Sequence, residues 1–224
     1  MNTNGAGLFD KWNERTTLDY IVSNEVHHLN ISRMHQDEYV NQMLMRYGDR
    51  YFSNDMLKDA IAYIGTHGTR VRLGCVLTKG GISTLSQMVE YIEFYQSLGI
   101  DHIIFREMTK FPDSAPNSVK KAYCYDNKVA LADIWDYMDR DVRFKRFKVA
   151  IGDYSELRVY QYGNVEVATK TSDAIKARVV QTADLDLVYG LVLHPNGNLT
   201  AGWIDDEDIL LKSEGSTTND QQIR

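Results

Sequence analysis

The chain has 224 residues, of which 43% are hydrophobic and 25% are charged, and its formal net charge is −6 at pH 7. This composition predicts a globular chain with enough apolar residues for a buried core, and it excludes an intrinsically disordered protein. The acidic balance argues against nucleic acid as a main partner, because binding the DNA or RNA backbone needs clustered positive charge. No run of 18 apolar residues predicts a membrane span and no secretion signal opens the chain, so a cytoplasmic location is expected.

The first residues, MNTNGAGL, contain turn chemistry, because Gly5 follows Asn4 and glycine accepts a positive φ angle without steric cost. Such a turn normally follows a strand, and the sequence shows no strand before it. Either these residues are a loose terminus, or the chain starts where a larger protein was already under way.

Residues 27–108 alternate strand and helix patterns. Short apolar runs predict strands at 27–34, 70–78 and 101–108, and apolar residues at a helical period predict helices at 36–48, 52–68 and 83–99. Ser53 or Asn54 is the expected N-cap of the second helix. Apolar strands separated by amphipathic helices are expected to run parallel, with the helices covering the sheet.

The regular alternation ends at residue 108. Residues 109–128 contain two of the three prolines and predict a long crossing loop, followed by a helix from about Val129 to Asp139. Strands are then predicted at 143–151, 156–171, 174–182 and 189–204, largely antiparallel, with turns at Gly163-Asn164 and Pro195–Asn198. The expected organisation is a βα region at 1–108, a connecting loop and helix at 109–140, a β-rich region at 141–211 and a disordered tail at 212–224.

Polar residues follow the predicted parallel strands. The strand ends carry Ser32-Arg33, Thr78–Gly81 and Arg106–Met108. Because binding residues in βα folds come from the C-terminal ends of the strands, a ligand site is expected there.

The other candidate metal and phosphate sites are better explained by structural roles. Adjacent histidines such as His27 and His28 point to opposite faces of a strand, and no H-x3-H pair exists, so no metal site is predicted. The TKGG segment lacks the spacing of a phosphate-binding loop, and the acidic run Asp205–Asp208 lacks that of a calcium loop. The two cysteines, Cys75 and Cys124, are too few for a disulfide framework or a thiolate metal site within this chain.

Five segments taken in order carry a family resemblance: TNG (3–5), NISRMH (30–35), VRLGCVLTKGGI (71–82), LGIDHIIFREM (98–108) and, more loosely, HPNGNLTAGW (194–203). Together they resemble the second half of a radical S-adenosylmethionine (radical SAM) domain, in the class typified by the molybdenum-cofactor cyclase. The resemblance implies a partial parallel (β/α) barrel in which TNG ends the third strand. It also answers the question raised by the opening turn, because the earlier strands would lie upstream of Met1.

The family's cluster motif, C-x3-C-x2-C, is absent, and Cys75 and Cys124 cannot replace it. A 4Fe-4S cluster that chelates S-adenosylmethionine needs three thiolates and one free iron. The resemblance therefore implies the C-terminal portion of a radical SAM enzyme, inactive alone, whose cluster is bound by a missing or separately encoded N-terminal half. A degenerate, non-catalytic βα binding module is the alternative, and the substrate, small molecule or peptide, is not specified by the sequence.

The resemblance also implies cofactor contacts. Thr3 and Ser32 are similar to hydroxyls that bind the methionine portion, and Arg72 is similar to a basic residue near the cofactor carboxylate. The segment Arg106, Glu107 and Met108 resembles the one beside adenine. Structural alternatives stay open: Thr3 as a helix cap, Ser32 in a turn, and Arg106-Glu107 as a surface ion pair.

Overall fold

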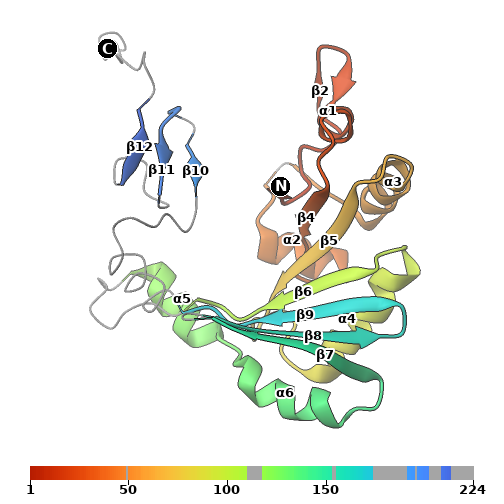
Figure 1. Ribbon diagram of the computed structural model, residues 1–224, viewed down its shortest axis with the longest axis vertical. Helices are drawn as coiled ribbons and strands as arrows, with labels where there is room; N and C mark the ends of the chain where they lie inside the picture. Colours follow the sequence, from red (N-terminus) through yellow and green to blue (C-terminus); the bar gives the residue numbers. More distant parts are fainter. Residues whose placement is uncertain are drawn as a thin grey trace. The chain divides into compact units, whose positions relative to one another are not determined.

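The computed structural model describes residues 1–48, 50–109, 118–152, 155–173, 191–194, 196–201 and 208–212 (Figure 1). The chain divides into two compact units, residues 1–175 and 176–224. The first unit has an α/β fold, as the sequence predicts, and the described part of the second forms a small antiparallel sheet. None of the described helices has the length and apolarity needed to span a bilayer.

The first unit is built on a seven-stranded sheet in the order β1-β4-β5-β6-β9-β8-β7 (Figure 1). Its strands are β1 (Asn2–Thr3), β4 (His28–Ser32), β5 (Arg70–Val76), β6 (His102–Arg106), β7 (Phe144–Ile151), β8 (Glu156–Tyr162) and β9 (Val165–Lys170). The first five in this order run parallel, whereas β8 is antiparallel to both β9 and β7. The strands predicted at 27–34, 70–78 and 101–108 are confirmed.

The described residues of the first unit also form the helices α1 (Thr17–Ser23), α2 (Glu38–Met45), α3 (Asn54–Gly65), α4 (Leu85–Ser97), α5 (Val119–Asn127) and α6 (Leu131–Arg140). A short hairpin of β2 (Lys11–Trp12) and β3 (Arg15–Thr16) precedes α1. The predicted N-cap Ser53 is confirmed, because its side chain accepts a hydrogen bond from the Met56 backbone. Thr84 and Gln87 form a capping box at the start of α4.

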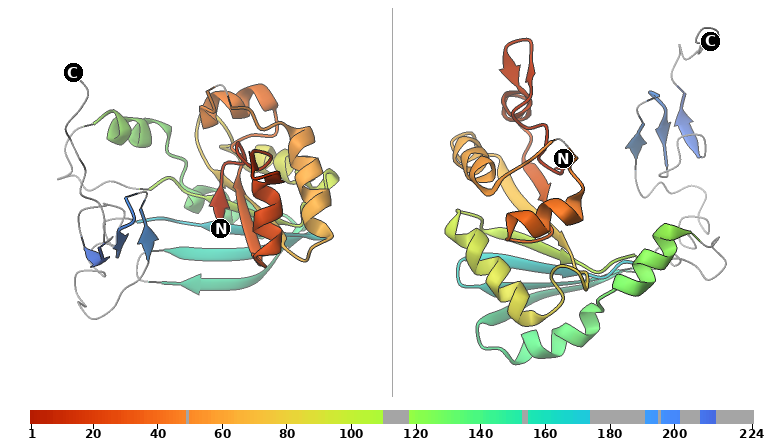
Figure 2. Two further views of the ribbon diagram at one scale, coloured as in Figure 1. Left: turned by 90° about the horizontal axis from the view of Figure 1, so that it is seen from above. Right: turned by 180° about the vertical axis from the view of Figure 1, so that it is seen from behind.

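Helices α1, α3, α4 and α6 pack on one face of the sheet. Alternate strand residues such as Ile31, Leu73 and Phe105 are buried in a single core with Leu57 of α3 and Ile92 of α4. Helix α4 lies behind the strands in Figure 1 and in front of them in the reverse view of Figure 2. Parallel strands added in one direction through right-handed crossovers place successive helices on the same side.

The other side of the sheet is here called the open face. It carries the alternate residues Asn30, Ser32, Arg72, Arg106 and Lys170, as the pairing of Asn30 with Arg72 and of Arg106 with Lys170 requires. A small apolar cluster of Ile104, Val159 and Ala168 also lies on this side, apart from the main core. None of the described helices contributes to that cluster.

Two expectations from the sequence are wrong. Part of the loop predicted at 109–128 is the helix α5, whose start is capped by Ser118, because its hydroxyl accepts from the Lys121 backbone at 3.1 Å. That helix buries no continuous apolar stripe, so its periodic signal is weak. A strand also precedes the opening turn: Asn2–Thr3 pairs with β4, and a two-residue strand is too short to show a periodic pattern.

The predicted turn at Gly163-Asn164 is confirmed, since it joins β8 to β9 with Gly163 at a φ of 57°. Strands β7–β9 extend the main sheet, because β9 pairs with β6. In the second unit, β10 (Val192–Leu193), β11 (Leu199–Thr200) and β12 (Ile209–Leu211) form the antiparallel sheet. The strand predicted at 174–182 and the tail from residue 213 lie outside the described residues.

Candidate functional site

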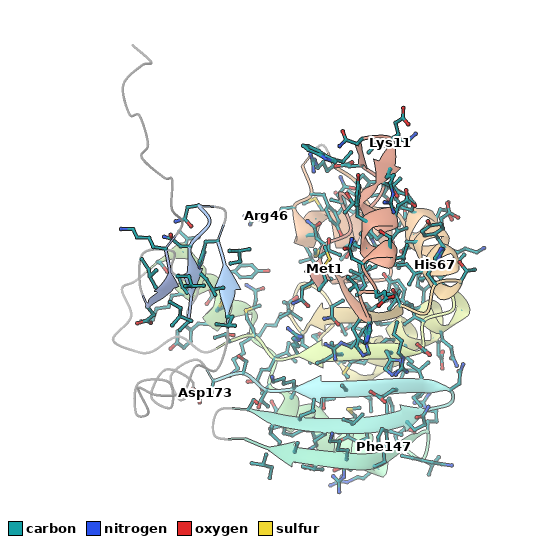
Figure 3. All side chains as sticks on the ribbon, turned by 45° about the horizontal axis from the view of Figure 1, so that its top comes forward. Met1, Lys11, Arg46, His67, Phe147 and Asp173 are labelled. Carbon is teal, nitrogen blue, oxygen red and sulfur yellow. The ribbon has the colours of Figure 1, made fainter. Side chains whose placement is uncertain are left out.

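The C-terminal ends of β5, β6 and β9 meet at one edge of the sheet, where Val76 pairs with Arg106 and Arg106 with Lys170. A pocket of about 450 Å³ opens there. Its lining includes Arg106, Glu107, Met108, Lys170 and Ser172, together with Cys124 of α5. In Figure 3, the label Asp173 marks the chain just beyond the end of β9. A cavity of about 190 Å³, lined by Thr69 and Asp101 among others, lies at the opposite strand ends, where βα folds rarely place chemistry.

Glu107 turns toward the helices. Its carboxylate lies 2.7 Å from Lys128 Nζ and accepts a hydrogen bond from the Leu131 backbone at 3.3 Å. Helix α6 begins at Leu131 without a side-chain bond from its own N-cap, so Glu107 places an anion at that N-terminus. The ion pair of Glu107 is thus made with Lys128, and not with Arg106 as the structural alternative suggested.

Arg72 lies in the middle of β5 on the open face, half-buried. Its Nε donates to Asn30 Oδ1 at 2.7 Å, and the Asn30 amide in turn donates to Asn2 Oδ1 at 2.8 Å. The terminal guanidinium nitrogens of Arg72 make no hydrogen bond to a residue that the structure describes. Burial, and then the charge of nearby Arg106, lower the pKa of Arg72.

Ser32 ends β4 on the same face, two residues after Asn30. Its side chain is half-buried, and within the described ranges its hydroxyl has no hydrogen-bond partner. Thr3, at the end of β1, is different because its hydroxyl accepts from the Gly5 backbone at 3.0 Å and so serves the turn. The structure therefore brings Arg106, Glu107 and Met108 to one pocket, places Ser32 and Arg72 on the open face of adjacent strands, and leaves Thr3 in a local turn.

Arg33 is fully buried, although the sequence suggested only a polar strand end. Its Nε donates to the Tyr95 hydroxyl at 3.2 Å, and its terminal nitrogens donate to the Phe52 carbonyl and to Asn54 Oδ1. The Tyr91 hydroxyl donates to the Arg33 carbonyl at 2.9 Å. Arg33 therefore joins the end of β4 to the start of α3 and to α4, and it is part of the scaffold that holds the strand ends in place.

The two cysteines occupy different environments. Cys75 is fully buried on the helix-covered face of β5, where burial raises the pKa of its thiol, and its Sγ lies 3.6 Å from the Met34 carbonyl. Cys124 lines the pocket half-buried, and burial raises its thiol pKa as well. A raised pKa disfavours the thiolate that binds metals. Among the described residues, no three or more His, Cys, Asp or Glu side chains are grouped to hold a metal ion.

Lys170, Thr171 and Ser172 also line the pocket, and sequence reasoning missed them. They follow a strand that the sequence assigns to an antiparallel region, whereas the expectation of ligands at strand ends concerns parallel strands. The sequence contains part of the information needed to find them, because its pattern predicts the strand at 156–171. It does not predict that β9 pairs in parallel with β6.

No family model and no curated protein matches the chain. Among solved structures, a crystal structure of a radical SAM methyltransferase from Sphaerobacter thermophilus is similar to it, with a TM-score of 0.35 and 19% sequence identity. The similarity covers 47% of this chain and 31% of that one, so the chain matches less than a third of that structure's length.

Proposed function

We propose that this chain binds S-adenosylmethionine on the open face of its sheet, at the C-terminal ends of β4, β5 and β6, as part of a radical SAM enzyme. The ordered segments that resemble that superfamily support the proposal. The observation that carries it is the pocket of about 450 Å³ lined by Arg106, Glu107 and Met108, the segment that the resemblance places beside adenine.

The winding of the sheet supports a partial (β/α) barrel as the fold of this site. Strands β1, β4, β5, β6 and β9 are neighbours in the order in which they occur along the chain. In doubly wound sheets the strand order reverses and helices cover both faces, whereas a barrel keeps one order and one helical layer. The open face would then be the inner surface of the barrel.

The side chains of the open face suit the functional groups of S-adenosylmethionine. The terminal nitrogens of Arg72 match a carboxylate, which a guanidinium binds through two parallel hydrogen bonds. The Ser32 hydroxyl can bond the methionine portion, and Met108 offers an apolar surface to adenine. We also propose Thr3 and Glu107 as S-adenosylmethionine contacts, although the side chains of both already accept hydrogen bonds within the chain.

The residues of this chain do not fit a 4Fe-4S cluster. Three thiolates are needed, and the chain has two cysteines, one of them enclosed in the core. We therefore place the cluster ligands outside these 224 residues, on a missing or separately encoded N-terminal half. Reconstitution of the chain alone with iron, sulfide and a reductant is expected to give no cluster absorbance and no 5′-deoxyadenosine.

The test is S-adenosylmethionine binding to the purified chain, measured by isothermal titration calorimetry. Ser32→Ala and Arg72→Gln should each weaken binding by about 1–3 kcal/mol, because each removes a partly buried hydrogen-bonding group. Ser86→Ala and Arg50→Gln, on exposed parts of the chain, are matched controls and should bind as the unmodified chain does. Absence of saturable binding, or equal affinity in all four variants, would contradict the proposal.

A non-catalytic binding module is the second candidate, favoured by the cysteine content of the chain, which is two residues, with Cys75 enclosed in the core. Co-expression with a protein that carries the C-x3-C-x2-C motif separates the two functions. Cleavage of S-adenosylmethionine by the complex supports the enzyme, whereas binding without cleavage supports the module.

A further inference from the structure

We infer that the pocket at the ends of β6 and β9 contains an anion-binding subsite, built on Arg106 and Lys170, for a small molecule that carries a phosphate group. This inference goes beyond the proposed function. It shares Arg106 and the pocket with the S-adenosylmethionine proposal, and it adds Lys170 and the pocket hydroxyls, which that proposal does not use.

The subsite begins with two like charges on paired strands. Arg106 and Lys170 are direct partners in the register of β6 and β9, they lie on the same face, and both line the pocket. Like charges placed directly opposite each other destabilise a sheet. An anion held between them would remove that repulsion.

No carboxylate of the described residues forms an ion pair with either side chain. Glu107, the acidic residue of the pocket lining, is already bound by Lys128 at 2.7 Å and by the α6 backbone. Glu166, farther back on β9, lies 3.6 Å from His102 Nε2. The pair Arg106 and Lys170 thus leaves a surplus of positive charge in a chain whose net charge is −6.

The charge of Arg106 acts on the neighbouring strand of the open face. The positive charge of Arg106 contributes, after burial, to the lowered pKa of Arg72. Three cationic side chains therefore stand on adjacent strands of one face, and their combined field favours an anionic ligand.

Hydroxyl groups complete the subsite. The side-chain oxygens of Thr109 and Ser172 lie 3.0 Å apart, and both residues line the pocket. A phosphate offers three acceptor oxygens and up to two negative charges, which suits one guanidinium, one ammonium and the one hydroxyl proton that the Thr109–Ser172 bond leaves free. A carboxylate offers one charge and two oxygens, so it would leave part of this set unused.

The experiment is calorimetric titration of the full chain with inorganic pyrophosphate at low ionic strength, with citrate as the carboxylate arm. Saturable pyrophosphate binding is expected, weaker at high salt because the site is electrostatic. Lys170→Gln and Arg106→Gln should each lower affinity at least about tenfold, the loss typical of a charge-assisted hydrogen bond. Lys170→Arg should keep most of the affinity, and Lys58→Gln, on the exposed side of α3, should leave it unchanged.

Four results would overturn the inference: no saturable pyrophosphate binding, undiminished binding by Lys170→Gln, an equal loss in Lys58→Gln, or tighter binding of citrate than of pyrophosphate. Melting curves identify a variant that fails to fold, in which case Arg106→Gln and Lys170→Arg decide the test. S-adenosylmethionine titrated into the same sample reports on the proposed function separately. Pyrophosphate binding without S-adenosylmethionine binding supports this inference and contradicts that proposal, and the reverse result contradicts this inference alone.

Discussion

The Nε atom of Arg33 donates a hydrogen bond to the Tyr95 hydroxyl at 3.2 Å, and both side chains are fully buried. The same hydroxyl donates to the His35 carbonyl at 2.9 Å, so one tyrosine of α4 holds the chain on both sides of Met34. Because this segment directly follows β4, the Arg33–Tyr95 contact fixes where the strand end and Ser32 lie relative to the helices.

Arg33→Met should lower the free energy of unfolding by about 3 kcal/mol. The substitution leaves the Phe52 carbonyl, Asn54 Oδ1 and the Tyr95 hydroxyl without their buried donor. Urea denaturation measures the change. The control, Arg50→Met, removes an exposed ion pair with Asp10 and should cost no more than about 0.5 kcal/mol. Equal stability of the two variants would contradict the structural role of Arg33.

Tyr95 should make the fold sensitive to alkaline pH. Burial raises the pKa of Tyr95 to about 12, above the ordinary tyrosine value of 10.0. A group whose pKa is higher in the folded state stabilises the fold below the unfolded pKa, and this stabilisation is lost as pH rises through the folded pKa. The free energy of unfolding should therefore fall between about pH 10 and 12.

Urea denaturation across that pH range measures the slope. Tyr95→Phe should reduce it, because phenylalanine does not ionise. Buried Tyr91, whose pKa is also raised by burial, should preserve part of the slope. Tyr39→Phe, at a side chain that is 75% exposed, is the control and should leave the slope as it is. An unchanged slope in Tyr95→Phe would show that this hydroxyl does not carry the effect.

Gly5→Ala should destabilise the chain by about 2 kcal/mol or more. Gly5 has a φ of 90°, and an added Cβ would come within 2.4 Å of the Phe52 ring. Gly65→Ala is the matched control, because that glycine ends α3 with open space around it, and it should be neutral or slightly stabilising. Melting temperatures distinguish the two; a Gly5→Ala variant as stable as Gly65→Ala would mean that the turn relaxes freely.

Glu107→Gln should cost about 1–2 kcal/mol of stability. The change removes a negative charge from the start of α6 and breaks the pair with Lys128. Glu90→Gln is the control: that exposed residue accepts one long bond, from Ser86 at 3.4 Å, and its substitution should have little effect. If the two variants have the same melting temperature, the carboxylate of Glu107 does not stabilise the start of α6.

The elements of residues 27–108 could be predicted from the sequence because their signals are local. Strand β5 alternates buried apolar residues with arginine and glycine, and α4 repeats its apolar residues at the helical period, so each buries one face wherever it packs. The cap at Ser53 depends on atoms three residues apart, which is also local. The polar residues at strand ends, including Ser32 and Arg106, could be proposed for the same reason.

The tertiary structure alone decided which strands are neighbours and which charges are buried. Lys170 enters the pocket because β9 pairs in parallel with β6, and no local pattern encodes pairing between strands so distant in sequence. Arg33 is enclosed because Tyr95, Phe52 and Asn54 converge on it from separate parts of the chain. A charged residue is stable in the core only when such distant partners satisfy its donors, so its sequence neighbours cannot reveal its burial.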